Sequence, residues 1–411
     1  MSTHSSLSPN QSVPHSHNPA ATPLWRELAP VCLMVFMEFL AMGLPLPILP
    51  LRVHGALGFG SFVVGLAIGA QSWVTLLTRH PAGTRSDRRG PRNATTFGLS
   101  VSIFAGVMYA ASTLVPSPAA SLAILLVGRG LLGLGESYVI TGALAWGISL
   151  AGRERSGVVM AWVGIAMYGA LAAGAPLGTL LHARTGFVGL SIAAALAPLA
   201  GIAMLPFVRD VEPTGGTRLG FREVVRLIAL PGAGLALCAL GFGSIAGFAT
   251  LLFQEHHWAH AALAMSAFGG AYVLARLFFA RLPDRFGGAR VAIASTAIAA
   301  VGQLGMWLAP TSTTAVLGAA LTGLGFSLAF PSFGVEAIRR VPPQNRGVAL
   351  GAYTACFDAA MGLGVPALGL LVGGFGNRAA FAAGAVGTIA SLLIAILSRR
   401  AESQRQANRA M

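Results

Sequence analysis

Twelve apolar runs, separated by short polar stretches, make up most of this chain of 411 residues. Each run is close to the ~20 residues that a helix needs to cross a bilayer. The runs are continuous and lack the alternating pattern of membrane barrel strands, so only helices can satisfy their backbone groups in lipid. The predicted spans cover residues 28–50, 60–78, 94–114, 120–149, 157–180, 187–207, 226–253, 261–280, 289–309, 314–337, 346–372 and 379–398.

Composition agrees with a membrane protein. Hydrophobic residues make up 55% of the chain and charged residues 10%, whereas soluble domains carry roughly 25% charged residues. The net charge of +14 raises the question of nucleic acid. All the basic residues are arginines, which lie mostly between the apolar runs and form no continuous basic face, so we expect the lipid bilayer and no nucleic acid as partner.

The arginines divide unevenly between the two sides of the predicted bundle. Twenty-three of the 27 lie on one side, in the even-numbered connections and both tails. Arg52, Arg184 and Arg378 lie on the other side, and Arg129 lies within a span. Since cytoplasmic loops collect basic residues, both termini are predicted to be cytoplasmic.

A polar stretch at 208–225 is the predicted linker between two sets of six spans, at 25–207 and 226–400. Residues 1–24 are rich in Ser, Pro, His and Asn and resemble no signal peptide, so they are predicted to form a disordered cytoplasmic tail. Residues 401–411 form a second predicted tail.

A polar motif occurs at the same place in both sets of spans. It joins the second span to the third and the eighth to the ninth, and it repeats an Asp-Arg-x-Gly core that a general excess of loop arginines does not explain. At a constant offset of 197, the shared positions are Arg79 with Arg276, Asp87 with Asp284, Arg88 with Arg285 and Gly90 with Gly287. A second internal repeat, at an offset of 190, aligns Glu136 with Phe326, Tyr168 with Asp358 and Pro176 with Pro366.

The first copy, Gly83-x-x-x-Asp87-Arg88-x-Gly90-x-Arg92, resembles the signature of the major facilitator superfamily. The resemblance covers about residues 23–400 and implies an all-α membrane protein with twelve transmembrane helices in two pseudo-symmetric six-helix bundles. It also implies that both copies are gating loops that control opening on the cytoplasmic side. Their residues are Gly83, Asp87, Arg88, Gly90 and Arg92 in the first copy, and Asp284, Arg285 and Gly287 in the second.

The same resemblance implies a monomeric transporter of a small organic solute, working by alternating access in a bacterial inner membrane. The drug–proton antiporter and sugar-efflux branch predicts efflux coupled to protons. The antiporter signature has a glycine before the proline of span five and paired glycines after it, whereas here Ala175 precedes Pro176 and Thr179-Leu180 follows. A sugar or organic-anion carrier that works by uptake or uniport is therefore the alternative within transport.

Other classes fit less well. No phosphate-binding loop follows a strand, so we expect the proton gradient as energy source and no cofactor. No intramembrane histidine is present to build an enzyme site, and a non-transporting sensor would append a soluble domain. His256 and His260 have the i, i+4 spacing of metal ligands but no cysteine nearby, so a solvated loop is preferred and no metal is expected.

Four ionisable residues lie within the spans, where a charge is costly and therefore indicates function. They are Glu38, Arg129, Glu136 and Asp358. At 1.5 Å per residue, Glu38 and Arg129 both come near the midplane, which predicts an ion pair in which Glu38 exchanges a proton. A permanently closed salt bridge is the alternative.

Glu136 and Asp358 are further candidates for a proton site. No cation is expected at the depth of Glu136, so it either is held protonated, meets a ligand or hydrogen-bonds to a neighbouring helix. Asp358 is expected to be unpaired and either titrates or packs through a hydrogen bond. Arg276 is assigned to the loop motif. Aromatic residues of spans one, four, seven and ten are candidates for the lining of an apolar cavity: Phe36, Phe39, Tyr138, Phe242, Phe248, Phe326, Phe330 and Phe333.

Overall fold

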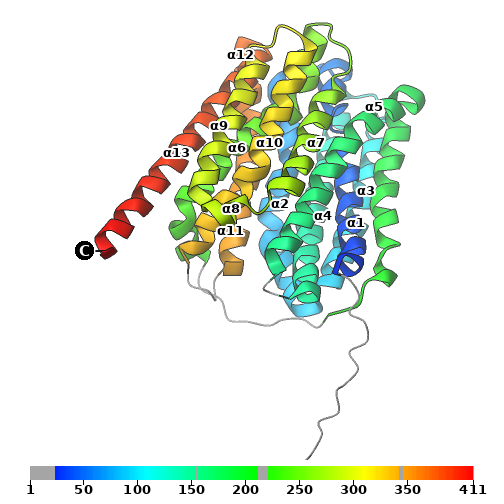
Figure 1. Ribbon diagram of the computed structural model, residues 1–411. Helices are drawn as coiled ribbons and strands as arrows, with labels where there is room; N and C mark the ends of the chain where they lie inside the picture. Colours follow the sequence, from blue (N-terminus) through cyan, green and yellow to red (C-terminus); the bar gives the residue numbers. More distant parts are fainter. Residues whose placement is uncertain (1–23, 153–154, 212–220, 342–345, 411) are drawn as a thin grey trace, which may run out of the picture.

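The computed structural model describes residues 24–152, 155–211, 221–341 and 346–410, and every regular element in these ranges is helical (Figure 1). Residues 1–23 of the predicted tail (1–24) and residues 212–220 of the predicted linker (208–225) lie outside the described residues. The elements are α1 (Leu24–Gly43), η1 (Leu51–Ala56), α2 (Ser61–Arg89), α3 (Pro91–Ala111), α4 (Pro118–Ala151), α5 (Ser156–Ile202), η3 (Leu205–Phe207), α6 (Phe221–Glu255), α7 (Ala262–Phe279), α8 (Leu282–Phe286), α9 (Gly288–Trp307), α10 (Ser312–Arg339), α11 (Arg346–Ala359), η5 (Ala360–Gly364), α12 (Val365–Phe375) and α13 (Arg378–Ala410).

The helices provide the twelve predicted crossings. Within the described ranges, ten segments are long and apolar enough to span a membrane. One of them, α5, holds two spans, because its axis breaks at Gly186, whose φ of 67° is a conformation that glycine adopts readily. The first crossing is α1, which is apolar apart from Arg26, Glu27 and Glu38. The eleventh crossing consists of α11, η5 and α12 in succession.

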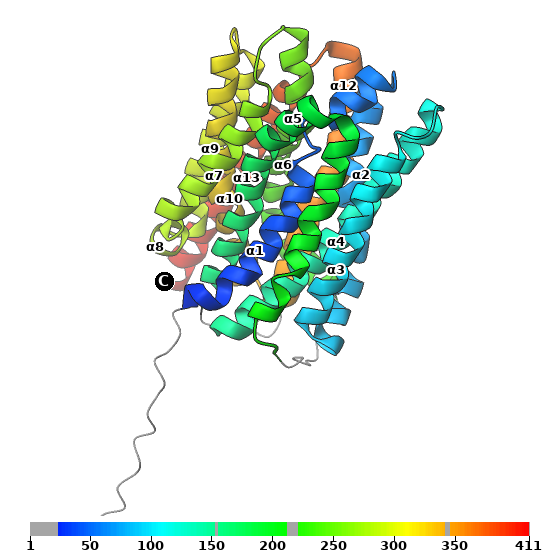
Figure 2. The same cartoon turned by 90° about the vertical axis from the view of Figure 1, so that its right-hand side faces the viewer.

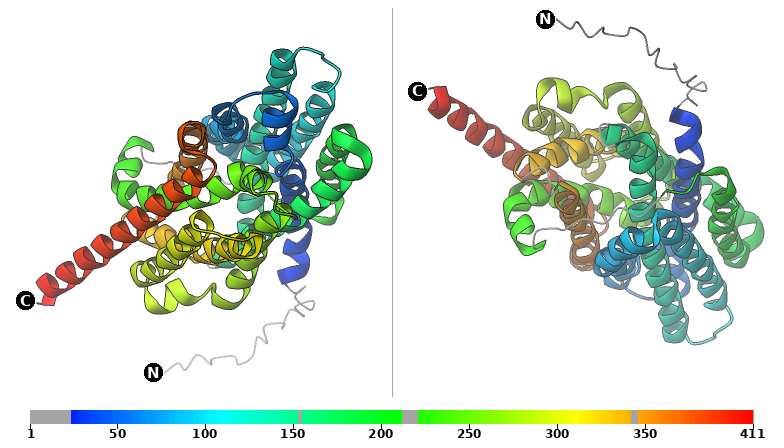
Figure 3. Two further views of the ribbon diagram at one scale, coloured as in Figure 1. Left: turned by 90° about the horizontal axis from the view of Figure 1, so that it is seen from above. Right: turned by 90° about the horizontal axis from the view of Figure 1, so that it is seen from below.

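The crossings pack as two bundles of six (Figures 1 and 3). In the first bundle, α3 and α2 pack on α4, and α1 packs on α5. In the second bundle, α9 and α7 pack on α10, and α6 packs on α13. The same order of neighbours in both bundles follows from the sequence repeat, since matching apolar faces select matching partners.

The two ends of the molecule differ in charge. The start of α1 and the junction of α2 with α3 lie at one end, and α12 reaches the other (Figure 2). We call the first end the arginine-rich face, because Arg88, Arg89 and Arg285 are exposed there. The second end is called the opposite face.

Two contacts between the bundles hold the molecule together. In the first seam, α2 packs against α11, η5 and α12; in the second seam, α5 packs against α7. Glycines bring the backbones into contact in both seams. A Cβ atom on Gly65 would lie 2.5 Å from the carbonyl oxygen of Val365, and one on Gly269 would lie 2.6 Å from that of Tyr168. The Gly65 contact lies about one turn from the start of α2, near the opposite face, whereas Gly269 meets Tyr168 in the middle part of the second seam.

Candidate functional site

A column of polar side chains follows one face of α2. Gln71, Thr75 and Arg79 are spaced four residues apart, which places them above one another on a helix. Gln71 and Thr75 are buried, although both lie in an apolar span. Because α2 belongs to the first seam, this column lies beside the contact between the bundles.

Glu136 on α4 meets the upper part of this column. Gln71 Nε2 donates a hydrogen bond to Glu136 Oε2 at 2.6 Å, and Thr75 Oγ1 lies 3.3 Å from the same oxygen. Thr75 Oγ1 also donates to the carbonyl oxygen of Gly133 at 3.0 Å. The hydrogen-bond partners of the Glu136 carboxyl group among the described residues are therefore neutral.

Arg79, at the lower end of the column, forms an ion pair across the first seam. Its Nε donates to Asp358 Oδ2 on α11 at 2.5 Å, and the Asp358 side chain is 2% exposed. The prediction of an unpaired Asp358 was therefore wrong, as was the placement of Arg79 in a loop. The reason is that α2 continues as a helix to Arg89, through Pro81, so Arg79 keeps its place on the seam face.

The predicted ion pair between Glu38 and Arg129 is absent from the described contacts. Glu38 Oε1 instead accepts a hydrogen bond from Ser102 Oγ at 2.6 Å. Arg129 donates from Nε to the carbonyl oxygen of Ala67 at 2.9 Å and from Nη2 to that of Ile68 at 3.0 Å. Both side chains are 1% exposed.

The depth calculation failed because α4 is far longer than the bilayer core. It has 34 residues, whereas the calculation assumed spans that end at the membrane surfaces. Measured from the arginine-rich face at 1.5 Å per residue, Glu38 lies roughly 21 Å along α1 and Arg129 roughly 33 Å along α4. Glu38 accordingly lies beside Gly135, with its Oε1 3.0 Å from where a Cβ on that glycine would be.

The second seam holds an aromatic cluster. Tyr168 on α5 stacks on Tyr272 of α7 with ring centroids 3.8 Å apart. Around them lie buried and half-buried rings from α6, α7, α10 and α11: Phe242, Phe268, Phe326 and Phe357. Of the aromatics proposed from the sequence, Phe242 and Phe326 belong to this cluster.

Arg276 lies beside the aromatic cluster and inside the molecule, so its assignment to the loop motif was wrong. The residue is 7% exposed. Its Nη2 donates to Tyr272 Oη at 2.7 Å, and its guanidinium carbon lies 5.3 Å from the centre of the Tyr272 ring. No carboxylate within the described residues pairs with it, and its Nε has no hydrogen-bond acceptor there.

The repeated polar motif is largely helical, where loops were expected. Gly83, Asp87 and Arg88 lie in the last turns of α2, whereas Asp284 and Arg285 lie in the short helix α8. The chain turns at two glycines of positive φ, Gly90 at 88° and Gly287 at 87°. In the first copy, Arg92 Nη1 lies 3.9 Å from Asp210 Oδ2, and both side chains are exposed.

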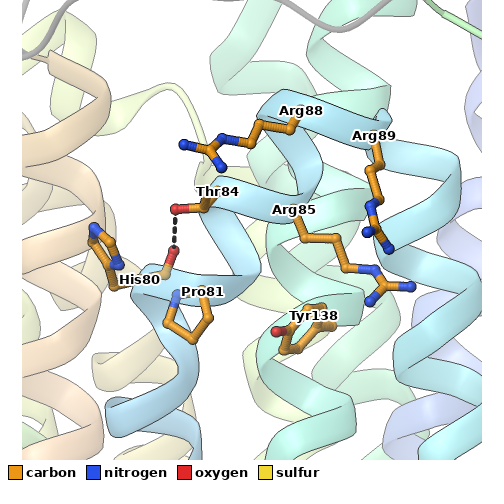
Figure 4. A pocket seen from close by; sticks show the side chains of 7 residues that line it. All are labelled: His80, Pro81, Thr84, Arg85, Arg88, Arg89 and Tyr138. Carbon is orange, nitrogen blue, oxygen red and sulfur yellow. Dashed lines mark hydrogen bonds between the residues drawn. The ribbon is translucent and has the colours of Figure 1, made fainter.

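A basic hollow of about 430 Å³ opens at the arginine-rich end of α2 (Figure 4). Arg85 and Arg89 point to the side on which Tyr138 of α4 lies, whereas Arg88 points back over Thr84. The Arg85 guanidinium carbon lies 4.2 Å from the centre of the Phe97 ring, and Arg85 Nε donates to Asn93 Oδ1 at 2.9 Å. The hollow is lined by His80, Pro81, Thr84, Arg85, Arg88, Arg89 and Tyr138.

Sequence reasoning missed the neutral members of the site. Gln71, Thr75 and Ser102 carry no charge, and a search for ionisable residues passes over them. The spacing of Gln71, Thr75 and Arg79 on one helical face was a signal that could have revealed the column.

Comparison with known proteins shows the family. The sequence profile described as Major Facilitator Superfamily matches residues 31–253 and 232–411. An uncharacterized MFS-type transporter of Salmonella typhimurium is 42% identical over 348 residues, which cover 84% of this chain and 90% of the relative. A second such transporter, from Burkholderia mallei, is 41% identical over 385 residues, which cover 93% of this chain and 94% of the relative.

Solved structures with the same fold include two transporters of low sequence identity. The human organic anion transporter MFSD10 superposes with a TM-score of 0.71 at 16% identity, over 91% of this chain and 99% of the other. A point mutant of the nucleoside transporter NupG superposes with a TM-score of 0.71 at 14% identity, over 90% and 99%. With its twelve crossings, its two repeated bundles and its 42% identity to an MFS-type transporter, the chain belongs to the major facilitator superfamily.

Proposed function

We propose that this transporter exports a small organic solute in exchange for protons, and that Glu136 is the main proton site. The observation that carries the proposal is the setting of Glu136, a buried carboxyl group hydrogen-bonded to an amide and a hydroxyl group. A carboxyl group with neutral partners can gain or lose a proton without breaking an ion pair, and in a low-dielectric interior only its neutral form avoids a large desolvation cost.

The polar column links this proton site to the contact between the bundles. Gln71 donates to Glu136 Oε2, so a proton on that oxygen would compete with the hydrogen bond that holds α2 to α4. Two turns farther along α2, Arg79 holds the first seam closed through Asp358. Proton binding at Glu136 would thus change how α2 is held, and α2 carries the tie between the bundles.

Orientation and energy source follow the same proposal. The excess of arginines on one face favours a cytoplasmic location for that face and for both termini, in the inner membrane of a bacterium. The protein would work as a monomer on the proton gradient, with no cofactor. Glu38, bonded to Ser102 within the first bundle, would serve as a second titrating group.

A sugar or organic-anion carrier that works by uptake or uniport is the competing function. The two structural neighbours are named for organic anions and nucleosides, but at 16% and 14% identity they support the fold alone. The proton-coupled function predicts that a protonophore abolishes uphill transport, whereas a uniporter would continue to equilibrate its solute.

The test uses reconstituted liposomes and a solute selected by thermal-shift screening of the purified protein against sugars, dyes and antibiotics. Glu136→Gln keeps size and hydrogen bonding but cannot titrate, so solute exchange without a pH gradient should persist while uphill transport driven by a pH gradient is lost. Glu38→Gln is the matched control and should reduce uphill transport less. Uphill transport at the normal rate in Glu136→Gln would overturn the assignment of the proton site.

A further inference from the structure

Arg276 is a buried cation for which the described residues provide no counter-charge. It extends from α7 toward Gly164 of α5, where a Cβ atom would lie 3.7 Å from its Nη2 and 4.0 Å from its Nε. Since Gly164 has no side chain, nothing from α5 covers the guanidinium group at that point. One phenol oxygen, on Tyr272, accepts a hydrogen bond from it.

The repeat shows what is missing. Arg276 corresponds to Arg79, which pairs with Asp358 in the first seam. The position in the second seam that corresponds to Asp358 is Tyr168, whose ring stacks on Tyr272. At equivalent positions of the repeat, therefore, Arg79 pairs with a carboxylate, whereas Arg276 bonds to Tyr272, whose ring stacks on Tyr168.

The other buried arginine among the described residues, Arg129, also lacks a carboxylate, and its Nη1 has no partner, but its remaining contacts differ. Arg129 donates to two backbone carbonyl oxygens within the first bundle and so has two fixed acceptors. Arg276 lacks such acceptors and lies on a seam, where alternating access would separate the bundles. A charge kept in a low-dielectric interior must be compensated in some state of the protein.

We infer that Arg276 binds the anionic group of the transported solute, and that the solute is a small organic anion with an aromatic or otherwise planar apolar body. An anion would supply the acceptors that the guanidinium group lacks, and Arg binds carboxylates and phosphates through paired hydrogen bonds. The Tyr168 and Tyr272 rings, which contact Phe242 and Phe326, are buried here and would offer flat apolar surfaces to the body of the solute when the second seam opens. This inference rests on the proposed transport function and names its substrate class.

The test measures binding to the purified full-length protein at neutral pH, by thermal shift and by titration. The probes are 1-naphthoate and phenyl phosphate, with 1-naphthamide as a neutral analogue of the same shape. The normal protein should be stabilised by at least one of the anions and not by the amide. Arg276→Gln should weaken anion binding by about tenfold to a hundredfold, the range expected for loss of a hydrogen bond to a charged group.

Two further variants separate a binding role from a structural one. Tyr168→Asp places a carboxylate where the first seam has Asp358, so it should block anion binding while the protein still folds. Arg281→Gln removes an exposed arginine just beyond the end of α7 and should leave anion binding unchanged. Without ligand, Arg276→Gln should be at least as stable as the normal protein, because it removes a buried charge; an arginine that only stabilised the fold would give a lower melting temperature.

The inference is overturned if naphthoate and naphthamide bind equally, if no anion of the set binds, or if Arg276→Gln and Tyr168→Asp both keep the preference for anions. None of these measurements uses a pH gradient. Loss of proton coupling in the Glu136→Gln experiment and loss of anion preference here are therefore independent results, and either proposal can fail without the other.

Discussion

The two seams place an arginine at the same position of the repeat, but only the first seam gives that arginine a carboxylate. Arg79 is bonded to Asp358 between the bundles, whereas Arg276 is bonded to Tyr272, whose ring stacks on Tyr168. In both seams a glycine brings the backbones of the two bundles into contact. The two halves of the repeat thus share their helix packing but differ in these side chains. Arg79 forms an ion pair with Asp358, whereas Arg276 has no carboxylate partner among the described residues.

The difference suggests a division of labour. A buried ion pair holds two elements in a defined position and must be broken before they separate, which suits a tie between moving bundles. An arginine without a counter-charge is instead ready to bind an anion. On the proposed function, the first seam would act as the gate and the second seam would recognise the solute.

Breaking the ion pair should have the largest effect. Asp358→Asn leaves Arg79 buried without its carboxylate and should lower the free energy of unfolding by about 3–5 kcal/mol, the cost of breaking a buried pair. The loss should fall near the lower value, because 18% of the Arg79 side chain is exposed. Thermal unfolding of the purified protein measures it.

The second seam provides the matched comparison, since Arg276→Gln deprives no carboxylate of its partner and should not lower the melting temperature. Exchange of the pair, with Arg79→Asp and Asp358→Arg in one chain, should restore part of the stability. If Asp358→Asn unfolds at the same temperature as the normal protein, the ion pair does not stabilise the contact between the bundles. The proposed difference between the two seams would then be wrong.

Filling the glycine contacts should have an intermediate effect in both seams. A methyl group at Gly65 would meet the Val365 carbonyl oxygen at 2.5 Å, and one at Gly269 would meet that of Tyr168 at 2.6 Å. Each Gly→Ala change should cost about 1–3 kcal/mol by overpacking, and Gly65→Ala should shift the protein toward states open on the opposite face. Labelling of single cysteines near that face measures the shift, with Gly270→Ala, which has open space around it, as control.

If Gly65→Ala and Gly269→Ala differ greatly, the seams are not equivalent in their backbone contacts. If both behave like Gly270→Ala, the bundles are not held together by these glycines.

Most of the fold could be predicted from the sequence because it depends on the length and polarity of each segment. Run length predicts each crossing, and the repeat offsets predict two similar bundles. The exceptions are instructive. The length of α2 was underestimated because a polar stretch at the membrane surface, Arg79 to Arg89, can continue a helix as easily as form a loop.

The candidate site was harder to predict because it depends on how deep each side chain lies in the membrane and on contacts between segments far apart in the sequence. The depths of Glu38 and Arg129 were counted from opposite membrane faces, and because α4 is longer than the bilayer core, two residues expected at one depth lie more than a helical turn apart. Nothing in the sequence says which face of α2 meets α11, so the pairing of Arg79 with Asp358 was missed. The correspondence of Asp358 with Tyr168 was visible beforehand, and its meaning became clear only when Arg276 was found inside the second seam.

The smallest expected effect concerns the glycines that end the two polar motifs. Gly90 and Gly287 have φ of 88° and 87°, a region in which a Cβ atom clashes with the backbone. Gly90→Ala and Gly287→Ala should therefore each cost about 1–2 kcal/mol, measured as a modest fall in melting temperature. Neither position is crowded, since the nearest atom to a Cβ on Gly90 would be 3.8 Å away and none lies within 4 Å at Gly287. The cost is therefore one of backbone conformation alone, and it should be equal in the two copies.

Gly83→Ala, in a helix with open space around it, serves as the control and should be neutral or slightly stabilising. A large cost at Gly90 with none at Gly287 would show that the divergence between the seams extends to the turns that end them.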